Sequence, residues 1–114
     1  DITIEISPTS NISTMSVKEW KLHPIKNMID NGIKVALCSD DPAMFNTKIT
    51  REYTALYKYG LLTKWSDIKK IVMNGVNSSF LPDGEKSVIA DEFKKELDLI
   101  ESNSYFQQVI EKLL

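Results

Sequence analysis

The chain has 114 residues, of which 42% are hydrophobic, and its 14 basic side chains are nearly balanced by 16 acidic ones. That length allows one ordinary domain at most, and the apolar share is typical of a folded protein rather than a disordered one. A net charge of −2 lacks the clustered positive field that binds nucleic acids or anionic membranes, and no apolar run approaches the roughly 20 residues of a membrane-spanning helix.

The first part of the chain is predicted to form a strand, a helix and a second strand. Ile2–Ile6 alternates apolar and polar residues, which predicts a strand, and residues 7–11 are expected to form the turn that ends it. After a linker, Pro24–Asn31 is predicted to be a short helix, because Pro suits the first helical position and Gly32 the residue past the end. The apolar run Lys34–Cys38 predicts a buried strand. Short joins in this order imply parallel strands.

The rest of the chain is predicted to be helical. Helices are expected over residues 50–60 and 63–79, with Thr50 and Thr63 as their N-caps, and over residues 83–100 and 104–114. Two strands and about five helices make an unbalanced domain, because parallel sheets occur almost only with both faces covered. We therefore expect residues 1–114 to be the terminal part of a larger α/β fold, with no separate second domain.

Paired acids follow the second predicted strand, in the segment Ser39-Asp40-Asp41-Pro42. The carboxyl ends of parallel strands are where α/β enzymes place their functional residues. Successive strand residues point to opposite sides, so Asp40 and Asp41 cannot both aim at one point of a regular strand. One can bind a metal while the other contacts a substrate or a group around the metal. The alternative is that either Asp caps a helix or starts a turn, as Asx-Pro often does.

The other polar candidates favour structural roles. His23 precedes a proline at a helix start, where a lone His usually caps the helix or lies at the surface. Cys38 lies inside a strand and is expected to be a buried small hydrophobe rather than a nucleophile. Packing or solvated helix faces are expected for the aromatic and lysine-rich positions Tyr53, Tyr57, Tyr59, Trp65, Lys69 and Lys94.

The chain contains one Cys and one His. This count excludes an internal disulfide and a zinc site built from several cysteines, and it fits a reducing compartment, so we expect a cytoplasmic protein. A catalytic zinc usually has three protein ligands, most often His. The chain is therefore poorly equipped to build such a site alone.

A series of short motifs runs along the chain: Pro8-Thr9-Ser10-Asn11, Ser16-Val17, His23-Pro24-Ile25, Asp30-x-Gly32, Val35-x-Leu37, Ser39-Asp40-Asp41-Pro42-Ala43-Met44-Phe45, Thr47-x-Ile49-Thr50-x-Glu52-Tyr53 and Asn77-Ser78-Ser79-Phe80-Leu81. In this order and spacing, up to about Lys86, the series resembles the carboxy-terminal part of the adenosine deaminase family. The resemblance implies a (β/α)8 TIM barrel of the amidohydrolase type. This chain would supply its last two parallel strands and the closing helices, not a complete barrel.

The resemblance also implies a reaction, the zinc-dependent conversion of adenosine, and of deoxyadenosine, to inosine and ammonia. In the family's motif the first Asp is a zinc ligand, here Asp40, and the second, here Asp41, contacts the purine ring. A ring nitrogen accepts a hydrogen bond, so the Asp41 carboxyl must carry a proton, which burial beside another carboxylate would favour. The family's His-x-His pair, later His residues and proton-shuttling Glu have no matching positions here.

The implied partners are therefore a small-molecule purine nucleoside, one zinc ion for each complete site, and the missing N-terminal part of the same barrel. No catalytic residue is expected within this chain, and the isolated chain is expected to be inactive. Two alternatives stay open: an adenine or AMP deaminase of the same superfamily, and a non-catalytic fragment that needs a partner half. Thr9, the His23-Pro24 pair and the Thr50-x-Glu52-Tyr53 segment resemble the nucleoside enzymes more closely.

Overall fold

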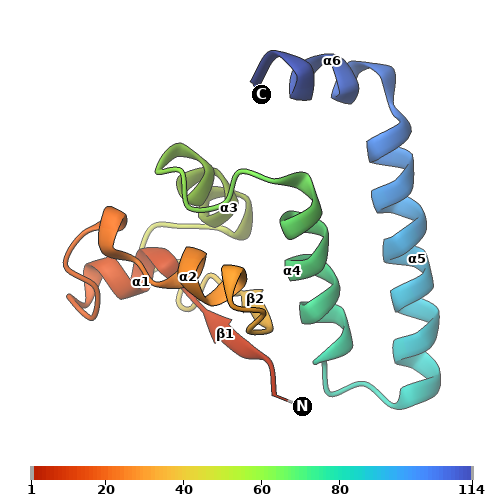
Figure 1. Cartoon of the computed structure of the whole chain (residues 1–114). Helices are drawn as coiled ribbons and strands as arrows, with labels where there is room; N and C mark the ends of the chain where they lie inside the picture. The colour runs from red at the N-terminus through yellow and green to blue at the C-terminus, as the bar shows by residue number, and fades with distance from the viewer. Residues whose placement is uncertain (1, 114) are drawn as a thin grey trace. The chain divides into compact units, whose positions relative to one another are not determined.

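A computed structural model of the chain describes residues 2–113, and it divides into two compact units between Ser78 and Ser79. The first unit contains β1 (Ile4–Ile6), α1 (Pro8–Ser13), the 3-10 turn η1 (Trp20–Leu22), α2 (Ile25–Asp30), β2 (Val35–Leu37), α3 (Ile49–Lys58) and α4 (Trp65–Asn77). The second contains α5 (Asp83–Ser102) and α6 (Ser104–Leu113) (Figure 1). No helix of the described residues is long and apolar enough to cross a membrane. The expectation of one domain over residues 1–114 stays a prediction.

The two strands of the first unit pair in parallel, with Ile4 opposite Val35 and Ile6 opposite Leu37. This confirms the predicted strand, helix and strand with parallel pairing. The strands are shorter than the predicted ranges, three residues each, although the flanking Lys34 carbonyl and Cys38 amide still hydrogen-bond to β1 (2.8 Å and 2.9 Å).

The core of the first unit surrounds this short sheet. Its most buried apolar side chains are Ile25 of α2, Val35 of β2 and Leu56 of α3, which are 0%, 1% and 0% exposed. Helix α4 also packs on β2, and the Asn74 side-chain amide donates a 2.9 Å hydrogen bond to the Val35 carbonyl. The second strand is therefore held by helices as well as by β1.

The segment after β1 corrects the sequence prediction. Residues 7–11, expected to be a turn, begin helix α1, and Pro8 occupies its first turn. Proline suits this position because the N–H that it lacks would have no partner inside the helix. The amide of Asn11 donates to the Ser7 carbonyl (2.9 Å), which closes the first helical turn. Pro8 therefore ends the strand, as predicted, but it does so by starting a helix.

The expected linker after α1 also contains structure, the 3-10 turn η1. Its Trp20 ring stacks on the ring of Tyr59, with 4.9 Å between the ring centroids and 4° between the planes. This contact joins the turn to the end of α3.

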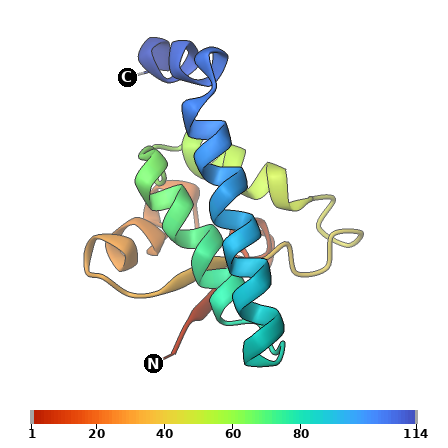
Figure 2. The ribbon, with the colours of Figure 1, turned by 90° about the vertical axis from the view of Figure 1, so that its right-hand side faces the viewer.

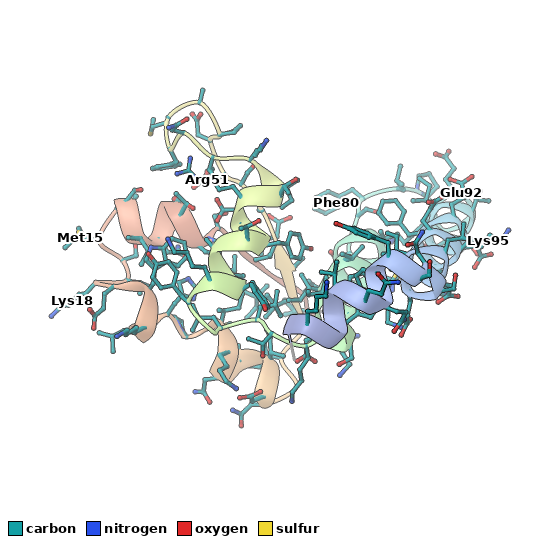
Figure 3. The ribbon with its side chains drawn as sticks, turned by 90° about the horizontal axis from the view of Figure 1, so that it is seen from above. Met15, Lys18, Arg51, Phe80, Glu92 and Lys95 are labelled. Carbon is teal, nitrogen blue, oxygen red and sulfur yellow. The ribbon has the colours of Figure 1, made fainter. Side chains whose placement is uncertain are left out.

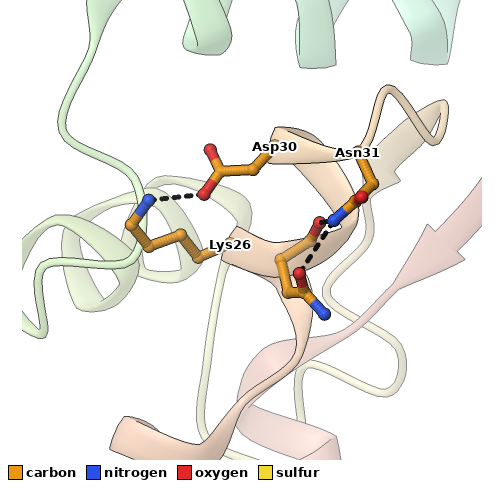
Figure 4. A network of polar contacts seen from close by, with 4 residues as sticks. Lys26, Asp30 and Asn31 are labelled. Carbon is orange, nitrogen blue, oxygen red and sulfur yellow. Dashed lines mark hydrogen bonds and ion pairs between the residues drawn. The ribbon is translucent and has the colours of Figure 1, made fainter.

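Helix α2 is one residue shorter at each end than predicted, and Pro24 is its N-cap residue rather than its first helical residue. An ion pair of 2.7 Å joins Lys26 to Asp30 one turn later (Figure 4). The Asn31 amide donates to the backbone carbonyl and the side-chain oxygen of Asn27, both at 2.8 Å. The hydrogen bond and the charge of Lys26 lower the pKa of Asp30.

The predicted threonine N-caps of α3 and α4 are wrong. Helix α3 begins at Ile49, so Thr50 lies inside its first turn, and α4 begins at Trp65, two residues beyond Thr63. Neither helix has a side-chain hydrogen bond at its cap. The residue type favoured a cap, but one or two residues of offset change which amide groups a side chain can reach.

The two helices of the second unit were predicted correctly to within two residues, although position 114 lies outside the described residues. The Asn103 side chain accepts hydrogen bonds from the amides of Tyr105 (2.9 Å) and Phe106 (3.2 Å), which caps the start of α6. Lys94 on α5 is exposed and lies 4.0 Å from Asp91, as expected for a solvated face. Figure 3 labels Glu92 and Lys95 on the same helix.

Candidate functional site

Two polar segments leave the carboxyl ends of the parallel strands side by side. The chain after β1 enters α1 directly, and the chain after β2 forms a loop over residues 38–48 that leads to α3. The Cys38 amide donates to the Ile6 carbonyl (2.9 Å), so the two strand ends stay paired where these segments begin. Figure 2 shows the loop projecting from the first unit. This edge is where the sequence predicts the functional residues.

Asp40 is exposed in this loop, and its carboxylate is held by α1. The Ser10 hydroxyl donates a 2.8 Å hydrogen bond to Asp40 Oδ2, across 30 residues of sequence. Asp40 has a φ of 54°, in the left-handed region that Asp tolerates better than most residues. Its amide donates to Cys38 Sγ (3.3 Å). Backbone and side chain together therefore orient the Asp40 carboxylate at the end of β2.

Asp41 is also exposed, and it forms the turn that the sequence left open as an alternative. Its Oδ1 accepts the Met44 amide (3.0 Å), and its carbonyl accepts the Phe45 amide (3.0 Å). A carboxylate has two oxygens with about four lone-pair sites, so this turn leaves capacity for a second contact. The described residues do not bury Asp41 beside another carboxylate.

The loop is attached to α3 by a second set of contacts. Arg51 Nη1 donates to the Asn46 carbonyl (2.7 Å), and Figure 3 shows Arg51 at the start of α3 beside the loop. Asn46 has a positive φ of 48°, and Asp40 near the other end of the loop also has a positive φ, of 54°. Asn and Asp adopt this conformation more readily than other side chains, which explains two of the turns in the loop.

Glu52 also lies at this edge, and sequence reasoning placed it in the Thr50-x-Glu52-Tyr53 segment but gave it no role of its own. Its side chain is 0% exposed, and its Oε2 accepts the Thr9 amide at 2.9 Å. Its Oε1 accepts the hydroxyl of Thr47. The signal was present in the sequence, because Glu52 lies one turn before Leu56 on the face of α3 that enters the core.

His23 caps a helix, which is one of the two roles expected of it, and it is buried rather than at the surface. Its Nδ1 accepts the Ile25 amide at the start of α2 (3.2 Å). The other ring nitrogen, Nε2, therefore carries the hydrogen and donates to Asn11 Oδ1 (3.1 Å). Burial lowers the pKa of His23, and the negative charge of Glu52 opposes this more weakly. The neutral ring is thus a structural link between α1 and α2.

The other candidates have structural contacts, although Cys38 lies just past the end of β2, not inside the strand as was expected. Cys38 is half-buried, and Tyr53 packs against the core, where burial raises the pKa of its hydroxyl. Tyr59 is used in the stack with Trp20, and Tyr57 is 40% exposed. Of these side chains, Cys38 contacts the backbone of Asp40, whose amide donates to its Sγ (3.3 Å), and Tyr53, Tyr57 and Tyr59 take no part in the hydrogen bonds around Asp40 given above.

The described residues of this edge do not form a complete metal site by themselves. Among the residues that the structure describes, no group of three or more His, Cys, Asp or Glu side chains could hold a metal ion. Asp40 fits one position of a zinc site, because carboxylate ligands are typically hydrogen-bonded from behind, as Ser10 does here. The remaining donors would have to come from other chain segments.

Comparisons with known proteins agree on one family. The family model described as "Adenosine deaminase" matches residues 1–96. An adenosine deaminase of Plasmodium gallinaceum is 42% identical over 95 residues, which is 83% of this chain and 25% of the relative. An aminodeoxyfutalosine deaminase of Streptomyces coelicolor is 40% identical over 91 residues, which is 80% of this chain and 23% of the relative.

The comparison with solved structures finds an adenine deaminase from Arthrobacter aurescens. It has a TM-score of 0.77 and 28% identity, over 85% of this chain and 29% of that chain. The predicted fold class is thereby confirmed, a portion of a (β/α)8 barrel in which residues 2–113 contain two parallel strands and helices rather than a closed barrel. The chain spans about a quarter of the length of the curated relatives it matches.

Proposed function

The chain belongs to the adenosine deaminase family, and from this premise we propose that it forms part of a hydrolase that removes the amino group of a purine. The observation that carries the proposal is the Asp40 carboxylate, held by Ser10 at the carboxyl end of β2 in an α/β fold. In (β/α)8 barrel enzymes the active site lies at this edge, the carboxyl ends of the strands.

The proposed cofactor is one zinc ion, with Asp40 as one of its ligands. The chemistry that zinc supplies when bound is the activation of water for attack on C6 of the purine. The contribution of this chain is to present Asp40 in one orientation, because the Ser10 hydroxyl holds Oδ2, and Oδ1 is proposed as the oxygen that contacts the metal. The other zinc ligands and the proton shuttle are proposed to lie outside this chain.

The proposed role of Asp41 is a contact to the purine ring. Its Oδ1 is used in the turn to Met44, so Oδ2 is the atom available to the substrate. A ring nitrogen accepts a hydrogen bond, so this contact requires the carboxyl group to act as the donor. Asp41 would then orient the substrate, while Asp40 binds the metal.

Adenosine is the proposed substrate, together with deoxyadenosine. Support comes from the 42% identity to an adenosine deaminase over 83% of this chain. Adenine is the second candidate, because the matching solved structure is an adenine deaminase. The residues that complete the site would come from a preceding part of the same barrel, and the isolated 114-residue chain is proposed to be inactive and cytoplasmic.

The test uses the longer protein that carries this chain. Release of ammonia from adenosine, deoxyadenosine, adenine and AMP is measured, and turnover of none of them would refute the proposed reaction. Asp40→Ala and Asp40→Asn should lose both zinc and activity. Asp41→Ala should retain zinc while kcat/KM falls by orders of magnitude, because it removes the substrate contact and the turn hydrogen bond from Met44 but no metal ligand.

Zinc content is measured on each purified variant. Asp30→Ala is the matched control, since Asp30 is an exposed aspartate whose ion pair with Lys26 lies on α2. It should keep both zinc and activity. Equal zinc loss in the Asp40 and Asp41 variants would contradict the division of roles.

A further inference from the structure

We propose that Glu52 is a positioning residue that sets the orientation of Asp40 through Thr9 and Ser10. This inference rests on the proposed function, because it assigns a role in the same site. Glu52 has the only fully buried carboxylate among the described residues of the first unit, at 0% exposed. A buried carboxylate persists where it is hydrogen-bonded, and its partners here show what it holds.

The two oxygens of Glu52 bind the two segments that leave the strands. Oε2 accepts the amide of Thr9, in the first turn of α1 after β1. Oε1 accepts the hydroxyl of Thr47, at the end of the loop after β2. One side chain of α3 therefore joins both strand-end segments, across 43 residues in the case of Thr9.

The contact to Thr9 fills a position that α1 leaves open. The first amides of a helix have no partner inside it, and the N-cap residue Ser7 makes no side-chain cap hydrogen bond. Glu52 thus caps α1 from another helix. Because α1 has only six residues, its placement depends on such contacts from outside.

The placement of α1 is transmitted to Asp40 by the next residue. Ser10 follows Thr9 in the helix, and its hydroxyl donates to Asp40 Oδ2 at 2.8 Å. Ser10 is 6% exposed, so it has little freedom to move independently of the helix. A shift of α1 would move the Ser10 hydroxyl and release the Asp40 carboxylate from its orientation.

The carboxylate is suited to this role because both of its oxygens only accept. The Thr9 amide can only donate, whereas the Thr47 hydroxyl can donate or accept. Glu52→Gln can therefore keep both contacts if its amide group donates to Thr47, and Glu52→Ala keeps neither. The order of effects expected from this chemistry is small for Gln and large for Ala.

The experiment measures zinc affinity by chelator competition, kcat and KM in the longer protein that carries this chain. Glu52→Ala should weaken zinc binding roughly tenfold to a hundredfold, with kcat lowered more than KM is raised. Glu52→Gln should restore most of the affinity. Thr54→Val is the control, since Thr54 is an exposed threonine of α3 that bonds only its own helix (Thr50 carbonyl, 2.8 Å).

The path through Ser10 is tested by combining substitutions. Ser10→Ala should weaken zinc binding by itself, and adding it to Glu52→Ala should cause little further loss. If the loss of zinc affinity in the double variant equals the product of the two single losses, Glu52 does not act through Ser10, and the proposal is overturned. A zinc affinity of Glu52→Ala within twofold of the unsubstituted protein would also overturn it.

Hydrogen exchange separates this proposal from the proposed function. Glu52→Ala should speed exchange in residues 7–13 and 39–48, whatever the substrate. If Glu52→Ala does not fold, Thr47→Val supplies the comparison on a smaller scale, because it removes one of the two contacts of Glu52. If the protein deaminates no purine but Glu52→Ala still speeds exchange in these segments, the proposed reaction is refuted and the positioning role stands. If exchange is unchanged in Glu52→Ala, the positioning role is refuted.

Discussion

Substitution of Glu52 by Ala is expected to lower the free energy of unfolding substantially. It leaves the Thr9 amide and the Thr47 hydroxyl without their acceptor. A buried polar group that loses its partner costs about 1–3 kcal/mol, so the two together would cost about 2–6 kcal/mol. Thr47 is only half-buried, so water can reach its hydroxyl, and we expect a value near the lower end, about 2–4 kcal/mol. This is a large share of a typical stability of about 5–15 kcal/mol.

The assay is urea unfolding monitored by circular dichroism, and it is applied to a double-mutant cycle between Glu52 and Thr47. Thr47→Val removes one donor and keeps the shape of the side chain. Because both residues share one hydrogen bond, their effects should be non-additive by about 0.5–3 kcal/mol. Thr54→Val serves again as the exposed control on α3. Additive effects, or a loss below about 1 kcal/mol for Glu52→Ala, would show that the buried carboxylate does not stabilise this edge.

Three further predictions concern the first unit. Burial lowers the pKa of His23 below its usual value of 6.5, so the unfolded chain binds more protons than the folded chain between these two pKa values. The free energy of unfolding should therefore fall as the pH drops through 6.5, and His23→Gln should flatten this part of a pH series of urea unfolding curves. Gly60 has a φ of 70° and nothing within 4 Å of an added Cβ, so Gly60→Ala should cost only the backbone strain, about 1–2 kcal/mol in the same assay; no loss would mean that the backbone relaxes to negative φ. Ile25→Ala removes a side chain that is 0% exposed and should cost about 2–5 kcal/mol, and a loss as small as that at an exposed site would contradict its place in the core.

The elements that could be predicted are those whose signals are local. The alternation of Ile2–Ile6 and the apolar run Lys34–Cys38 contain enough information to predict two strands and their parallel pairing. Helix α1 was not predicted, because a proline such as Pro8 is compatible with two structures. It can end a strand, and it also suits the first turn of a helix. One contact that favours the helix is the hydrogen bond from the Thr9 amide to Glu52, which lies 43 residues away. No window of sequence around Pro8 contains that information.

The same distinction applies to the site. The position of Asp40 and Asp41 after β2 follows from the strand prediction, and so does the expectation that this edge is functional. The burial of His23 and Glu52 could not be predicted from the sequence, because charged and titratable residues are ordinarily exposed unless a specific partner is present. Those partners come from α1 and from the loop before α3, which only the folded chain brings together.

The different surroundings of Asp40 and Asp41 have a cause other than the one that strand geometry suggests. Alternation along a regular strand predicts opposite directions for neighbours, but β2 ends at Leu37, before either residue. The left-handed φ of 54° at Asp40 turns the chain there, so that Asp40 meets Ser10 while Asp41 closes its own turn on Met44. A non-glycine residue in this conformation costs about 1 kcal/mol or more, and such strain persists where surrounding contacts maintain it. Asp40→Asn tolerates the same backbone and can still accept from Ser10, so its loss of zinc would isolate the charge of the carboxylate from the shape of the turn.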